Sequence, residues 1–201
     1  KSSNYGRDLM KVLENRHKKI FISESAFGMI PFKDSTVSDY LSYVGTVDKS
    51  FDAKEAKKKK DEIRIEGRLY LDLGDKNKSY PFFEDLGVDS LVLDEAHMYK
   101  NSKSVLEFKS AKQLSTPGAS ARGVNMQVAS WWIRGRSKLG DGVLALTATP
   151  VTNSPLEMYS MLSLATGEEE LNRRLGAIRG ADEFMKAFCR VSETEAENLI
   201  G

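Results

Sequence analysis

The sequence has little cysteine and little histidine. Its 201 residues contain one cysteine, Cys189, and two histidines, His17 and His97. A single cysteine forms no disulfide within the chain, which favours a reducing, cytoplasmic location over secretion. Three such side chains are also too few for a structural zinc site with four Cys and His ligands. The composition therefore excludes disulfide-stapled and zinc-finger scaffolds.

The sequence also lacks a strong net charge and a long apolar run. Lys and Arg total 30 against 29 Asp and Glu, so the net charge of +1 excludes a protein that binds nucleic acid through overall charge. No apolar run approaches the roughly 20 residues of a membrane span, and no membrane partner is expected. Residues 1–5 show neither a signal-peptide pattern nor an initiator methionine, and we expect the chain to be a piece of a longer polypeptide.

Hydrophobic patterning predicts strands that alternate with helices. Short apolar runs predict strands, and a period of 3.6 residues predicts helices. The expected strands are 19–22, 89–93 and 142–146; the expected helices are 5–16, one capped by Ser35, 119–136, 155–167 and one around 184–188. Such alternation predicts an α/β fold with parallel strands and many flanking helices.

Two local patterns refine this outline. Ser154-Pro155-Leu156-Glu157 predicts a helix start, with Ser as N-cap, Pro in the first turn and Glu closing a capping box. Residues 48–78 include four consecutive lysines and are expected to form a charged helical insertion. A charge run of this kind either faces water or contacts nucleic acid, and the sequence leaves both open.

Polar residues follow two of the predicted strands. Asp94 and Glu95 come directly after strand 89–93, and Thr147 and Thr149 after strand 142–146. Parallel sheets bind ligands beyond the carboxyl ends of their strands. Hydrolysis of a nucleoside triphosphate needs one carboxylate on the magnesium shell and another group that orients or deprotonates water. Asp94 is therefore the predicted metal residue and Glu95 the predicted catalytic base.

These strand ends resemble two motifs of one family. Asp94-Glu95-Ala96-His97 resembles the Walker B box of superfamily 2 helicases and translocases, and Thr147-Ala148-Thr149-Pro150 resembles their motif III. The residues that follow each box are similar to the Swi/Snf-like type. Residues 28–31 and 83–89 resemble the helicase portion of large phage and mobile-element proteins, some of which also carry methyltransferase or antirestriction regions.

The resemblance implies a fold and an activity. It implies that residues 1–201 are the C-terminal portion of a first RecA-like domain, with 155–201 as a helical segment after motif III. The implied parent is an ATP-dependent helicase or translocase with ATP and magnesium (Mg²⁺) as cofactors. Its implied partners are DNA, expected in duplex form, and the remaining helicase domains of the parent chain.

The resemblance also implies roles for individual residues. Coupling of the nucleotide to DNA is assigned to His97, Thr147 and Thr149. Contact with nucleic acid is assigned to Ser23, Ser25, Lys100 and Asn101. Two alternatives stay open, because loop serines are ordinary turn formers and Lys100-Asn101 can simply cap a turn.

One expected motif is missing from the sequence. No Gly-x-x-x-x-Gly-Lys-[Ser/Thr] loop, which cradles the triphosphate, occurs in the 201 residues. We therefore expect this chain alone to hydrolyse ATP negligibly. The alternatives are a non-catalytic DNA- or protein-binding module of a mobile-element polypeptide and a fragment of an RNA helicase, which shares the Asp-Glu-Ala-His box.

Overall fold

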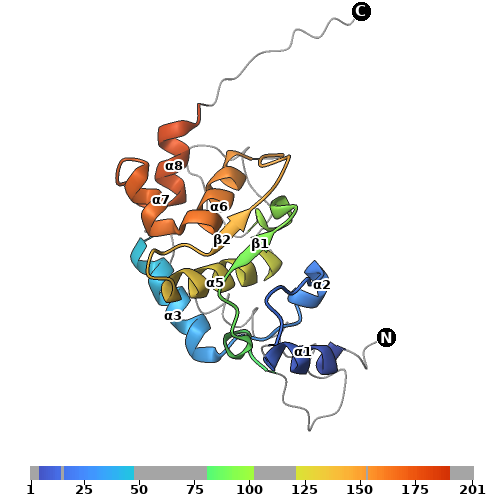
Figure 1. Cartoon of the computed structure of the whole chain (residues 1–201). Coiled ribbons are helices and arrows are strands. Elements are labelled where there is room, and N and C mark those ends of the chain that lie inside the picture. Colours follow the sequence, from blue (N-terminus) through green and yellow to red (C-terminus); the bar gives the residue numbers. More distant parts are fainter. Residues whose placement is uncertain (1–4, 15, 48–80, 102–120, 153, 191–201) are drawn as a thin grey trace, which may run out of the picture.

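The structure of the chain is a computed structural model that describes residues 5–14, 16–47, 81–101, 121–152 and 154–190. Within these ranges the structure has a two-stranded parallel sheet, seven α-helices and two short 3-10 helices (Figure 1). This mixed arrangement confirms the α/β class. None of the helices in these ranges is both long and apolar enough to cross a bilayer.

The two strands are parallel neighbours. Strand β1 (Leu91–Leu93) pairs with β2 (Val143–Ala145), with Leu91 opposite Val143. The ladder continues past both strands, because the N–H of Ala96 donates to the carbonyl of Leu146 at 2.8 Å. The strands are shorter than predicted, but the prediction that they are parallel is confirmed. Their carboxyl ends therefore lie at one edge of the sheet.

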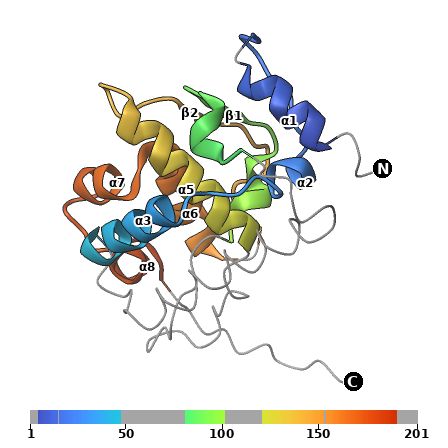
Figure 2. The ribbon, with the colours of Figure 1, turned by 90° about the horizontal axis from the view of Figure 1, so that it is seen from below.

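Helix α5 (Ala121–Arg136) is the central helix of the core. It packs against α3 (Asp34–Val47), which runs beside it in Figure 2. The ring of Trp131 lies 5.9 Å from the ring of Tyr40 and 6.0 Å from that of Tyr43. Trp131 therefore serves helix packing. Helix α3 begins one residue before Ser35, so the predicted helix is confirmed and the predicted cap is wrong.

The sheet packs on α5 through one face. Leu93 is buried in a cluster with Met126, Ala129 and Ile133 of α5. Gly142 enters β2 with φ 101°, and a Cβ there would lie 2.8 Å from the Ile133 side chain, so only glycine fits. The opposite face stays open, with Val92 66% and Leu144 52% exposed.

Three helices after β2 form a second layer of packing. Helices α6 (Pro155–Thr166), α7 (Glu168–Arg174) and α8 (Ala181–Phe188) enclose an apolar cluster around Tyr159 and Phe184. The hydroxyl of Ser154 accepts from the N–H of Leu156 at 3.2 Å, which confirms the predicted N-cap. The predicted capping box is wrong, since Glu157 accepts from the N–H of Thr152 at 2.7 Å instead.

The remaining described elements lie before β1. They are α1 (Tyr5–Leu13), α2 (Glu24–Phe27) and the 3-10 helix η1 (Phe83–Leu86). The strand predicted at residues 19–22 is wrong. That stretch has no regular structure and Phe21 is 97% exposed. An apolar run becomes a strand only with a ladder partner. The predicted insertion at 48–78 and the end of segment 155–201 beyond 190 lie outside the described residues.

Candidate active site

The turn after β1 presents two carboxylates. Asp94 is exposed, and its Oδ1 accepts from the N–H of Glu95 at 3.1 Å. Glu95 then adopts φ 51° and ψ 46° and begins the 3-10 helix η2 (Ala96–Tyr99). This left-handed conformation costs a non-glycine residue about 1–2 kcal/mol. Local strain of this kind clusters at functional sites, and here it falls on the predicted catalytic base.

His97 connects the two strand ends. Its Nδ1 lies 3.1 Å from Oε2 of Glu95 and 3.4 Å from Oγ1 of Thr147. The His97 side chain is 27% exposed and that of Glu95 is 62% exposed. The contact with Thr147 is a hydrogen bond whose donor depends on the imidazole tautomer, and the contact with Glu95 is an ion pair when the imidazole is protonated.

Thr149 joins this cluster through its backbone. Its N–H donates to Oγ1 of Thr147 at 3.1 Å, while the residue itself is exposed. The hydroxyl of Thr147 is thus held from two sides, by His97 and by the turn that follows β2. The structure therefore brings together Glu95, His97, Thr147 and the backbone of Thr149, with Asp94 directly adjacent in the turn.

The two predicted serine contacts lie on a separate element. Ser23 is the N-cap of α2, and its hydroxyl accepts from the N–H of Ala26 at 3.3 Å. Ser25 is exposed within the same four-residue helix. Ser23 therefore has a local turn-forming role, the alternative that the sequence left open. Asn101 is half-buried and follows Lys100, the C-cap of η2.

Lys100 is held in a buried ion pair that sequence reasoning missed. Its Nζ lies 3.1 Å from Oε1 of Glu157, and the two side chains are 13% and 2% exposed. Glu157 stands 57 positions later, a spacing to which no helix or strand period assigns a contact. The only sequence signal was the position of Glu157 in the first turn of a predicted helix. The ammonium of Lys100 consequently faces the protein.

Tyr99 packs η2 against the hydrophobic core. The residue is buried, and this burial raises the pKa of the Tyr99 phenol, with the Glu24 carboxylate adding to the effect and Arg122 opposing it. Arg122 and Glu24 form an ion pair. Tyr99 therefore packs η2 into the core, near the ion pair that joins α2 to the start of α5.

The carboxylates suit a metal that arrives with phosphate. Among the residues that the structure describes, no group of three or more His, Cys, Asp or Glu side chains could hold a metal ion. Mg²⁺ in nucleotide sites is commonly held by one or two carboxylates together with water and substrate phosphates. The exposed carboxylate of Asp94 fits that mode, whereas a self-sufficient protein site would need further ligands.

The comparisons with known proteins find similarity to a phage protein. The chain is 28% identical over 196 residues to "Defense against restriction protein B" of Escherichia phage P1. The match covers 93% of this chain and 8% of the phage protein, so the chain spans a small part of that relative's length. No solved structure matches.

These findings correct the family resemblance. The similarity that is found is to the phage restriction-defence protein and no family model matches, so the identification of the chain as a member of the superfamily 2 helicases and translocases of Swi/Snf-like type is wrong. The α/β class rests on the structure itself and is unaffected.

Proposed function

We propose that the chain supplies the magnesium-site and water-activating carboxylates of an ATP-dependent motor that acts on DNA, built on a RecA-like domain. One observation carries the proposal: His97 Nδ1 lies between Glu95 (3.1 Å) and Thr147 (3.4 Å) at the carboxyl ends of two parallel strands. Nucleotides bind at that edge of doubly wound sheets.

Each residue has a distinct part in the proposal. Asp94 holds the metal that accompanies the nucleotide, and Glu95 accepts the proton of the attacking water. His97 keeps the Glu95 carboxylate aligned and links it to Thr147. A displacement of one strand end is therefore transmitted to the other. Bound Mg²⁺-ATP supplies the phosphoryl group and the charge neutralisation.

DNA is the proposed polymer partner. The name of the phage relative refers to defence against restriction, a process directed at DNA, and this favours duplex DNA over RNA. Contact through backbone phosphates would be independent of sequence and weakened by salt. Because the chain spans 8% of that relative, we assign the activity to a longer polypeptide. Its expected location is the reducing cytoplasm.

The test is the ATPase activity of a longer polypeptide that contains this chain together with a phosphate-binding loop. Steady-state turnover is measured with and without duplex DNA. Glu95→Gln is expected to lower turnover by about 10²–10⁴-fold, the usual contribution of a general base. Glu14→Gln, the same change at an exposed site after α1, is the matched control and should retain full turnover.

A binding module is the second candidate. The absence of a Gly-x-x-x-x-Gly-Lys-[Ser/Thr] loop from the 201 residues favours it, because that loop provides most of the contacts to a triphosphate. This candidate predicts DNA or protein binding that Glu95→Gln leaves unchanged. ATP turnover that ignores Glu95→Gln, or no turnover at all, would make it the leading function.

A further inference from the structure

A buried ion pair lies beside the candidate active site. Lys100 and Glu157 approach to 3.1 Å, and their side chains are 13% and 2% exposed. Charges taken out of water are stable only when they pair closely and their remaining polar atoms find partners. Removing one partner would leave the other buried and uncompensated. The pair therefore constrains the segments that carry it.

Thr152 completes the arrangement. Oε2 of Glu157 accepts from the N–H of Thr152 at 2.7 Å and from its hydroxyl at 3.2 Å. The ammonium of Lys100 donates to that same hydroxyl. The hydroxyl thus accepts from Lys100 and donates to Glu157, which closes a ring of three residues. We call Lys100, Thr152 and Glu157 the clamp.

The clamp joins both strand ends to α6. Lys100 follows η2, and its N–H donates to the carbonyl of His97 at 3.3 Å. Thr152 stands three positions after Thr149 in the turn that follows β2. Glu157 lies in the first turn of α6. The carboxylate of Glu157 therefore contacts both the segment that follows η2 and the segment that follows β2.

We propose that the clamp is a positioning device, in which Glu157 pins both turns so that His97 stays within reach of Thr147. Lys100 and Glu157 act through His97 and are positioning residues. The effect of the clamp on ATP turnover rests on the proposed function. The placement of His97 does not, because it is measurable without any activity.

The first experiment follows the imidazole side-chain signals of the 201-residue chain by nuclear magnetic resonance. The chain has two histidines, so exposed His17 is an internal reference for His97. Glu157→Gln and Lys100→Met should move the His97 signals and leave those of His17 in place. The amide of Thr152 should exchange with solvent at least about tenfold faster, as expected when a hydrogen bond to a charged acceptor is weakened.

Two controls keep the proposal falsifiable. Glu170→Gln also breaks an ion pair, but an exposed one on α7, and should leave the His97 signals unchanged. The double variant Lys100→Met/Glu157→Gln removes both buried charges together, a change that proteins often tolerate, and covers the case in which a single variant fails to fold. Folded clamp variants with His97 signals at their original positions would overturn the proposal.

The second experiment measures ATP turnover in the longer polypeptide. A clamp that positions His97 predicts that Glu157→Gln lowers kcat by about tenfold or more with little change in KM, since it perturbs the chemical step rather than binding. Turnover unchanged in Glu157→Gln would overturn the catalytic consequence of the clamp. No turnover in the unmodified protein would contradict the proposed function. The His97 signals would still test whether the clamp positions His97.

Discussion

Glu95 combines an exposed carboxylate with a left-handed backbone, and both properties are testable at this one position. Its φ of 51° is unfavourable for any residue with a Cβ. We predict that Glu95→Gly leaves the free energy of unfolding unchanged or raises it by up to about 1 kcal/mol, because relief of strain offsets the entropy that glycine adds to the unfolded chain. Urea denaturation of the 201-residue chain measures this.

The neighbouring residue is the control for that prediction. Asp94 is absent from the positive-φ residues, so Asp94→Gly gains no relief and is expected to lower the free energy of unfolding by about 0.5–1 kcal/mol. Equal losses in the two variants would contradict the assignment of strain to Glu95.

Asp94 also allows a prediction about metal binding. A single carboxylate without phosphate oxygens leaves Mg²⁺ mostly hydrated, so titration of the chain with Mg²⁺ in the absence of nucleotide should show no saturable binding by calorimetry. A stoichiometric binding heat that disappears in Asp94→Asn would contradict this and would indicate a self-sufficient metal site.

At the scale of elements, the start of α6 depends on a side-chain cap. The buried hydroxyl of Ser154 accepts from the N–H of Leu156 at 3.2 Å. Ser154→Ala is expected to lower the free energy of unfolding by about 1 kcal/mol. Ser35→Ala, at an exposed position within α3, should change it by less than about 0.5 kcal/mol. If Ser35→Ala lowered the free energy of unfolding as much as Ser154→Ala, the loss in Ser154→Ala could not be attributed to the cap.

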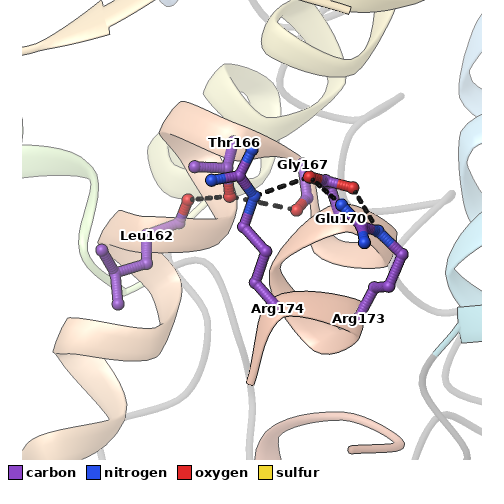
Figure 3. A network of polar contacts seen from close by, with 6 residues as sticks. All are labelled: Leu162, Thr166, Gly167, Glu170, Arg173 and Arg174. Atoms are coloured by element: carbon purple, nitrogen blue, oxygen red, sulfur yellow. Dashed lines mark hydrogen bonds and ion pairs between the residues drawn. The ribbon is translucent and has the colours of Figure 1, made fainter. Parts of the chain in front are cut away.

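Helix α7 carries an ion-pair network on its surface (Figure 3). Glu170 accepts from Arg173 Nε at 2.8 Å and from Arg174 Nε at 2.6 Å. These contacts, Arg173 first, lower the pKa of Glu170 from 4.5 to about 2. Nearby, the hydroxyl of Thr166 donates to the carbonyl of Leu162 at 2.9 Å and marks the end of α6.

This network predicts an acid-dependent contribution to stability. Because the folded pKa is lower than the unfolded value, the contribution is present above pH 4.5 and is lost as the pH falls through about 2. Urea denaturation should therefore show a stability difference between the wild type and Glu170→Gln that narrows from pH 5 towards pH 2. The difference should be small, since the pair is exposed and screened by salt. A narrowing of equal size in Glu169→Gln would contradict the assignment to the arginine contacts.

At the scale of the whole molecule, local rules predicted both strands and the longer helices, but not α2 or α7. Apolar runs and the Ser154-Pro155 cap were enough for β1, β2 and α6, because these signals act over a few neighbouring residues. The pairing of β1 with β2, which the sequence left open, places Glu95 and Thr147 within reach of the same His97 side chain. The contact between Lys100 and Glu157 was not predictable in this way, since only packing brings residues 57 positions apart together.

At residues 19–22, by contrast, the sequence predicted a strand that the structure does not form. Ile20, Phe21 and Ile22 satisfy the composition of a buried strand, yet they are exposed and unpaired in the described part of the chain. Composition reports what a segment can bury, whereas a strand exists only where a second backbone accepts its hydrogen bonds. The sequence pattern predicts a propensity for β-structure, but a neighbouring strand is needed for the segment to form a strand.

The central claim is that Glu95 activates water at a nucleotide site formed by the two strand ends. The most direct measurement is single-turnover hydrolysis of bound ATP by the longer polypeptide, followed by rapid quench, together with ATP affinity measured at equilibrium. The account predicts that Glu95→Gln retains ATP affinity and slows the chemical step by about 10²-fold or more. A chemical step that proceeds at the unmodified rate in Glu95→Gln would contradict it.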